Sequence, residues 1–313
     1  MLNKTKKIVF KNNPFAKKGR WLKANLHTHT TNSDGILSPR DAILKYAQHG
    51  YQVLAITDHN RCTIPDASDT GGLLLIPAAE YHPLNSINLL SKKHHFVCLN
   101  VKKEIENIQS IHAQDLIDEI LAQNGMVIAG HPYWLKQNIY DLASLRGISA
   151  IEVYNTTCGA VGRELSDQIW DDYCCRVKPV YGIADDDCHF KSPEEFAGGW
   201  IWIKAEESSL ETVMSAIKNG EFYSSTGPLI NDISLCLSEP DHNNWQGIQV
   251  TAECSPARSV CFIAPYGGAQ VFAEAEKTIE KASAVLNPKN PFLRVEIRGH
   301  DGKTAWSNPI EIV

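Results

Sequence analysis

One short segment of this chain, LHTHTTNSDG (26–35), gathers residues that could bind a metal ion. In an extended strand, residues i and i+2 point the same way, so the imidazoles of His27 and His29 can share one ion. Gly35 allows a tight turn that would bring the Asp34 carboxylate back towards the same point. Imidazole together with carboxylate suits zinc, iron or manganese better than calcium or a thiolate-bound metal.

The elements that would position these residues are short apolar strands alternating with amphipathic helices. One helix is expected after Ser38, with Ser38 as N-cap, Pro39 at the first helical position and a stop at Gly50. The expected strands cover residues 21–27, 51–59, 73–80, 95–101, 126–132, 149–155, 178–187 and 199–205. This alternation indicates an α/β fold with a largely parallel sheet, which periodicity alone cannot assign to a barrel or to an open doubly wound sheet.

Candidate metal ligands end several of the expected strands, and this favours the barrel. They are His27, His59, Glu80, His131 and Asp187. Barrels build their active sites where the carboxyl ends of different strands converge on one face. Glu80 follows the apolar run LLLIPAA, where burial of a carboxylate without a partner is costly, so a ligand role is favoured.

The segment HTHTTNSDG followed by ITDHN (56–60) resembles the PHP (polymerase and histidinol phosphatase) family of metal-dependent hydrolases. Both motifs occur in the family's order, each at the end of an apolar run, and the resemblance covers roughly Trp21 to Pro228. It implies a distorted seven-stranded (β/α) barrel. We therefore expect an N-terminal lead-in over 1–20, the barrel over 21–228 and a further domain over 229–313.

Carried over by motif, the resemblance implies nine metal ligands and two to three divalent ions, which would be manganese, iron or zinc. The nine are His27, His29, Asp34, His59, Glu80, His95, His131, Asp187 and His189. Asp187 and His189, in DDDCH, match the family's closing Asp-x-His, which leaves Asp185 and Asp186 to support the ligands or face solvent. The position at His95 stays open, since His94 is adjacent and this residue lies before its strand instead of after it.

This ligand set supports hydrolysis of a phosphate ester. Three divalent ions, three carboxylates, neutral imidazoles and a bridging hydroxide leave a net charge of about +2, which attracts an anionic group. We expect the metal-bridging hydroxide to attack a small phosphomonoester or cyclic phosphate in line, while a residue of the ligand shell protonates the leaving group. The expected catalytic residues are Asp34, His59 and His189, with Asp58 orienting a ligand histidine.

The phosphate itself requires a cation, and Arg163 in CGAVGRELS is the residue that we expect to hold it. Lys136 or Arg61 would assist it. A loop arginine is also a common surface residue, so this assignment depends on kinetics.

After residue 228 the helical pattern gives way to short strands, which predicts a small antiparallel β domain of sandwich type. The end of the barrel and the segment FLRVEIRGHDGKTAWSNPIEIV resemble the carbaryl-hydrolase-like branch of PHP metallohydrolases. The activity named for that branch is hydrolysis of a carbamate ester. A carbamate or carboxyl-ester hydrolase is therefore the first alternative function, and a non-catalytic metal-binding module is the second.

The composition limits the classes of molecule that the protein is expected to bind. The formal net charge of −6 argues against general nucleic-acid binding, and the expected partner is a small anionic substrate drawn to the positive metal site. Nine scattered cysteines without a CxxC pair, an N-terminus without an apolar segment and the lack of a membrane-length apolar run predict a cytoplasmic protein without membrane contact. An oligomer contact through the β domain is a further expectation.

Overall fold

The chain divides into two compact units in its computed structural model. The structure describes residues 7–8, 10, 13–64, 70–84, 94–275 and 277–312. One unit is Gly19–Lys218, and the other combines Met1–Lys18 with Asn219–Val313. Strand β10 (Phe222–Ser225), which the sequence analysis assigned to the barrel domain, therefore belongs to the unit that holds the C-terminal strands.

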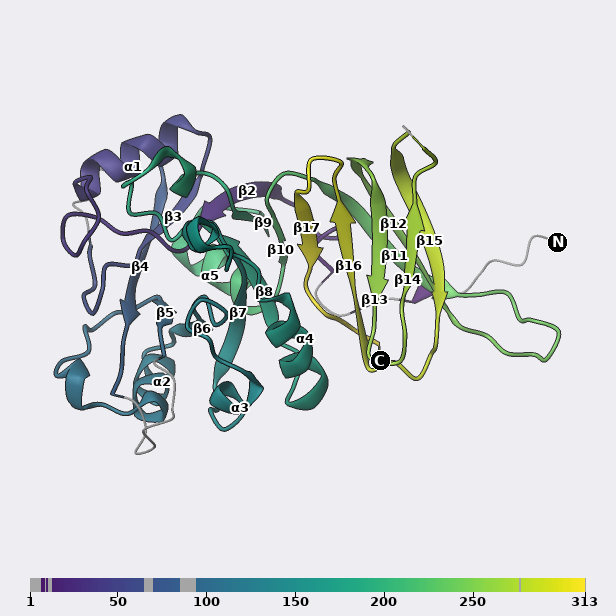
Figure 1. The fold of residues 1–313 in the computed structure, drawn as a ribbon, viewed down its shortest axis with the longest axis horizontal. Coiled ribbons are helices and arrows are strands. Elements are labelled where there is room, and N and C mark those ends of the chain that lie inside the picture. The colour runs from purple at the N-terminus through teal and green to yellow at the C-terminus, as the bar shows by residue number, and fades with distance from the viewer. Residues whose placement is uncertain are drawn as a thin grey trace. The chain divides into compact units, whose positions relative to one another are not determined.

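The unit Gly19–Lys218 is built on one mostly parallel sheet with the strand order β9-β2-β3-β4-β5-β6-β7-β8 (Figure 1). The strands are β2 (Arg20–Asn25), β3 (Val53–Ile56), β4 (Leu74–Tyr81), β5 (Phe96–Leu99), β6 (Met126–Ala129), β7 (Ile148–Asn155), β8 (Tyr181–Asp185) and β9 (Trp200–Ala205). Neighbouring strands are parallel except at β5, which runs antiparallel to β4 and β6, and at β9, which runs antiparallel to β2.

The α/β class with a largely parallel sheet is confirmed, but the closed seven-stranded barrel is not found. Among the described residues no strand ladder joins β8 to β9, so the sheet stays open. The backbone N–H groups of Ala197, Gly198 and Gly199, just before β9, donate to the carboxylate of Asp186 at 2.9, 2.9 and 3.1 Å.

Helices cover this sheet. They are α1 (Pro39–Gln48), α2 (Ala113–Ala122), α3 (Ile139–Leu142), α4 (Asp167–Arg176) and α5 (Leu210–Lys218). The predicted N-cap of α1 is confirmed, because the Ser38 side chain accepts a hydrogen bond from the backbone N–H of Asp41. Its buried face consists of Ala42, Ile43 and Tyr46. None of the described helices combines the length and the apolar character that crossing a membrane would require.

The strands β3, β5 and β6 are buried at every position, so both faces of the sheet are covered there. Such strands leave polar side chains only at their ends, because a buried polar group without a partner is costly. The direction of β5 matters for this reason. Since β5 is antiparallel to its neighbours, the residue before Phe96 lies at the same edge as the residues that follow Tyr81 and Ala129.

The second unit is all β. One of its sheets has the order β1-β11-β12-β15, and the other contains β14-β13-β16-β17-β10 with β18 paired to β16. The strands besides β10 are β1 (Lys7–Ile8), β11 (Ile230–Leu237), β12 (Ile248–Ala257), β13 (Ser259–Ile263), β14 (Ala269–Phe272), β15 (Ile279–Leu286), β16 (Phe292–Arg298), β17 (Thr304–Ser307) and β18 (Ile310–Glu311). All these pairings are antiparallel, as the sequence predicts.

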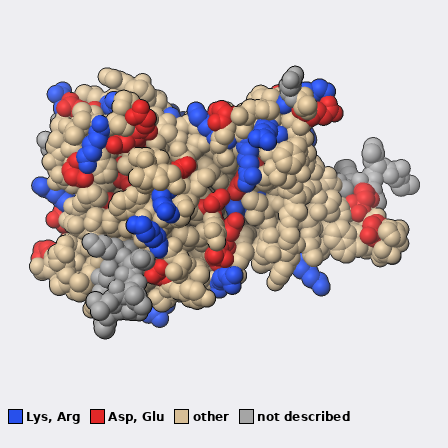
Figure 2. All heavy atoms as spheres, in the orientation of Figure 1, with Lys and Arg blue, Asp and Glu red and all other residues tan. Residues whose placement is uncertain are grey.

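The charged side chains are mixed on the face drawn in Figure 2. Lysine and arginine side chains are interspersed there with aspartate and glutamate side chains.

Candidate metal centre

The nine predicted ligands come together at one edge of the sheet of the unit Gly19–Lys218. Loops after β2, β3, β6 and β8 carry seven of them, namely His27, His29, Asp34, His59, His131, Asp187 and His189. Glu80 is the penultimate residue of β4, and His95 immediately precedes β5. The direction of β5 thus explains why a ligand candidate stands before its strand: the start of β5 and the ends of its neighbours share one edge.

Four buried side chains form the inner group of this centre. The Nε2 atoms of His27 and His29 lie 3.1 Å apart. Asp187 Oδ1 lies 3.2 and 3.0 Å from these two nitrogens, and Glu80 Oε2 lies 3.3 and 3.4 Å from them. Divalent ions that hold donors about 2.0 to 2.1 Å away place adjacent donors about 3.0 Å apart in octahedral and about 3.4 Å apart in tetrahedral coordination. The spacing of the four atoms fits one such ion.

The tautomer of His27 is set by Glu152, a residue that the sequence analysis did not single out. Glu152 Oε1 lies 2.5 Å from His27 Nδ1, and both side chains are fully buried. A carboxylate at Nδ1 keeps the proton there and leaves the Nε2 lone pair for a metal. The signal was present in the sequence, because Glu152 interrupts the apolar run AIEVY just as Glu80 ends another.

Glu152 also holds the backbone around two ligands. Its Oε2 accepts hydrogen bonds from the backbone N–H of His131 at 2.6 Å and from Asn155 Nδ2 at 3.0 Å. Asn155 Nδ2 in turn reaches Asp187 Oδ2 at 3.2 Å. His131 and Asp187 both have positive φ, 25° and 51°, which is a strained conformation for residues other than glycine. The backbone strain therefore lies at two predicted ligands, and the hydrogen bonds of Glu152 and Asn155 hold both of them in place.

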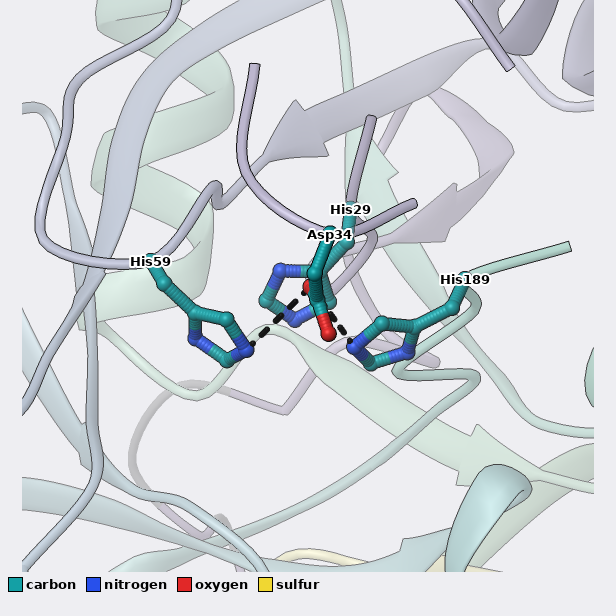
Figure 3. A group of neighbouring side chains, drawn as sticks. All are labelled: His29, Asp34, His59 and His189. Atoms are coloured by element: carbon teal, nitrogen blue, oxygen red, sulfur yellow. Dashed lines mark ion pairs between the residues drawn. The ribbon is translucent and has the colours of Figure 1, made fainter. Parts of the chain in front are cut away.

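A second group lies on the solvent side of the inner one and contains Asp34, His59 and His189 together with His29 (Figure 3). Asp34 Oδ1 lies 3.4 Å from His59 Nε2 and 3.2 Å from His189 Nε2. The rings of His29 and His189 stack with their centroids 4.2 Å apart. Asp34 is 47% exposed at its side chain, so this group is open to solvent whereas the inner group is not.

A third group contains Glu80, His95 and His131. Glu80 Oε1 lies 2.8 Å from His95 Nδ1 and 3.2 Å from His131 Nε2. The structure places His95, and not His94, against this carboxylate. His94 is buried beside Phe96, and its Nδ1 lies 3.1 Å from the side-chain nitrogen of Gln137. Because Oε2 of Glu80 faces the inner group and Oε1 faces this one, the carboxylate lies between two candidate ion positions.

Asp58 lies beneath the loop that carries Asp34. Its carboxylate accepts hydrogen bonds from the backbone and hydroxyl groups of Thr30, both at 2.7 Å, and from the hydroxyls of Ser33 and Thr63. We expected Asp58 to orient a ligand histidine. Its donors are loop residues, so Asp58 fixes the conformation of the loop that carries Asp34. Gly35 completes the turn by close approach, since an added Cβ would lie 2.5 Å from the carbonyl oxygen of His29.

Two further aspartates support the strand end next to the centre. Asp186 is fully buried and accepts hydrogen bonds from Tyr46 and Thr156 as well as from the loop before β9. Asp185 is also fully buried and belongs to a group of possible donors with His27 and Glu152. Burial raises its pKa well above the ordinary aspartate value.

The structure places Arg163 against an aromatic ring and a second cation beside Asp34. The guanidinium of Arg163 lies 4.4 Å from the centroid of the Tyr133 ring. Lys191, which the sequence analysis did not nominate, has its Nζ 3.1 Å from Asp34 Oδ2. Trp134 is 43% exposed, with its ring 5.3 Å from that of His131.

The buried donor atoms indicate that the centre is built for metal ions. Among the described residues, Glu80 Oε2, Asp187 Oδ1, His59 Nδ1 and His95 Nδ1 are buried without a hydrogen-bond partner. Each nevertheless lies within 3.4 Å of another candidate donor atom. Buried polar atoms that lie this close together without a hydrogen bond would be costly, and coordination would remove that cost. Imidazole and carboxylate donors fit zinc, iron and manganese alike.

The protonation states of the metal-free centre differ from one histidine to another. Burial lowers the pKa of His29 and of His95 to about 4, so both imidazoles are neutral at neutral pH. Burial acts in the same direction on His27, but the surrounding carboxylates outweigh it and raise the pKa of His27 well above its ordinary value. Burial would raise the pKa of Glu80 and Asp187, yet the neighbouring histidines, His27 foremost, hold both below their ordinary values.

Comparison with known proteins finds solved structures that resemble this chain. No family model matches the chain. A two-domain protein from Bacteroides vulgatus that contains a predicted PHP-like metal-dependent phosphoesterase superposes with a TM-score of 0.51 and 15% identity, over 98% of this chain and 98% of that one. The two chains share a fold.

Two weaker matches accompany it. A protein from Bifidobacterium adolescentis, proposed to be a metal-dependent phosphoesterase, superposes with a TM-score of 0.44 and 14% identity, over 65% of this chain and 98% of that one. An uncharacterized protein of Methanocaldococcus jannaschii is 27% identical over 150 residues, which are 43% of this chain and 82% of that protein. The resemblance to the carbaryl-hydrolase-like branch stays a prediction.

Proposed function

We propose that this protein is a metal-dependent phosphoesterase that hydrolyses a small phosphomonoester or cyclic phosphate, with two to three divalent manganese, iron or zinc ions. The observation that carries the proposal is the inner group, in which four buried donors from three strand ends have the spacing of a single ion's ligands. The fold shared with the Bacteroides protein supports it, because that protein contains a predicted PHP-like metal-dependent phosphoesterase.

Glu80 organises the proposed site. One of its oxygens faces His27, His29 and His59, and the other faces His95 and His131. Ions bound at these positions would lower the pKa of water and stabilise negative charge on a phosphoryl oxygen. Glu152 holds His27 in the tautomer that this arrangement needs.

The reacting group of the substrate is expected on the side of Asp34. Asp34, His59 and His189 lie beside the inner group and are solvent-exposed at 47%, 27% and 12% of their side chains. We assign the transfer of a proton to the leaving group to these residues. Lys191, half exposed beside Asp34, adds a positive charge that would attract the phosphate.

The substrate is expected to be small. The net charge of −6 and the mixed charges in Figure 2 fit a single anionic group better than an extended polyanion. Arg163, held over Tyr133, remains our candidate for a contact with the substrate away from the ions.

Phosphate release from a panel of phosphomonoesters and cyclic phosphates tests the proposal. Manganese-loaded protein is compared with Asp187→Ala, which removes an inner donor, and with Asp118→Ala, which changes an exposed aspartate on α2. We expect release by the native protein and by the Asp118 variant but not by the Asp187 variant. Protein that demonstrably binds metal but releases phosphate from no compound would contradict the proposal and direct the search to carbamate and carboxyl esters.

A further inference from the structure

His82 lies at the mouth of the centre, although nothing in the sequence marks it as a ligand. It follows β4, and because Tyr81 pairs with Phe96 in the antiparallel β4–β5 ladder, its neighbour across that ladder is His95. The two imidazoles stack with their centroids 3.7 Å apart and their planes at 14°. His82 Nε2 lies 3.5 Å from Glu80 Oε1.

The backbone of His82 is fixed in this position by Asn60. The Asn60 side chain accepts a hydrogen bond from the N–H of His82 at 2.8 Å, while the Asn60 N–H donates to the carbonyl oxygen of Glu80 at 2.7 Å. Asn60 follows His59 directly and has a φ of 54°. The same residue therefore ties the loop that carries His59 to the strand end that carries His82.

Packing alone does not account for a histidine at this place. Its Nε2 atom is buried and has no hydrogen-bond partner among the residues that the structure describes. A phenyl ring would stack on His95 equally well without leaving a polar atom unpaired, and an unpaired buried polar atom lowers stability. A bound ion would give this nitrogen the partner that it lacks among the described residues.

We propose that His82, with His59 and Glu80, forms a further binding position for a divalent transition-metal ion. One donor atom from each of these residues lies within 4.8 Å of the other two. The rings of His59 and His82 have their centroids 4.7 Å apart. Two imidazoles and one carboxylate are a donor set typical of zinc, with remaining positions open to water.

The position differs from the three groups that contain the predicted ligands. The His82 and His59 side chains are 26% and 27% exposed, whereas those of His27 and His29 are fully buried. Three protein donors and an exposed setting predict weaker binding and faster exchange than in the inner group. In addition, His59 faces both Asp34 and Glu80, so an ion here competes with the group at Asp34 for one imidazole.

Titration of the metal-free full chain with cobalt(II) alone, followed by absorption and by calorimetry, tests this position without any activity assay. His82→Phe keeps the ring stacked on His95 and removes both nitrogens. His112→Ala, at an exposed histidine that makes no side-chain capping hydrogen bond, is the matched control. We expect His82→Phe to bind one equivalent of cobalt fewer, with the weakest binding phase missing, and His112→Ala to titrate like the native protein.

The same stoichiometry and affinities for His82→Phe and native protein would overturn the proposal. Loss of the tight phases together with the weak one would also overturn it, because His82 would then act by positioning the other groups. If His82→Phe does not fold, as judged by circular dichroism, His82→Gln is titrated in its place with the same two criteria. A failure of phosphate release would leave this result unaffected, since no substrate is involved.

Discussion

Replacing Glu152 by Gln removes a buried negative charge while nearly preserving the shape of the side chain. In the native protein, one carboxylate oxygen accepts from His27 Nδ1 and the other accepts from the His131 backbone and from Asn155. An amide has one accepting oxygen and one donating nitrogen. If the amide oxygen faces His27, the amide N–H₂ lies against the N–H groups of His131 and Asn155, which are also donors. If the amide N–H₂ faces His27 instead, Nδ1 must accept, and the proton of His27 moves to Nε2.

Either orientation weakens metal binding at the inner group. Loss of a carboxylate that orients a ligand histidine typically lowers metal affinity about 10- to 100-fold, which corresponds to about 1.4 to 2.8 kcal/mol. We expect a change of this size for Glu152→Gln in competition against a chelator of known affinity. Glu211→Gln, at an exposed glutamate in the first turn of α5, controls for the change of charge. Equal affinities for Glu152→Gln and native protein would refute the role that we derive for Glu152.

Two further predictions concern protons and the substrate. The raised pKa of His27 means that its protonation stabilises the metal-free protein fully below about pH 6.5, and this stabilisation is lost as the pH rises through the raised value. Because metal requires the unprotonated nitrogen, the difference in Tm between loaded and metal-free protein should grow from about pH 6 to about pH 8, and a constant difference would contradict this. Arg163→Ala should raise KM for phosphate esters with the metal content unchanged; unchanged KM and kcat would end its assignment to the substrate.

Much of the centre could be predicted because burial makes polar residues conspicuous. Glu80 and His131 each stand at the end of an apolar run, where an unpaired polar group would be costly. The strands themselves follow from the same runs, and α1 follows from Ser38 and Pro39. These features are local, so a single sequence contains them.

The remaining features depend on which strands pair, and a single sequence does not specify this. The antiparallel direction of β5 brings His95 and His82 to the ligand edge, but an isolated apolar run carries no direction. The open sheet is equally non-local, because whether β8 and β9 pair is a property of both strands together and not of either apolar run. Glu152 is the exception, since the argument applied to Glu80 would have found it.

The hydrogen bonds between the first and last ligand loops have a consequence for folding. The N–H of Asp187 donates to the carbonyl oxygen of His27, and the N–H of His29 donates to that of Cys188, both at 2.9 Å. These partners are about 160 residues apart in the sequence, and contacts between distant segments carry a large loop-closure cost. We expect the inner group, and with it any bound ion, to form after the rate-limiting step of folding. We therefore expect metal to slow unfolding strongly while leaving the refolding rate nearly unchanged.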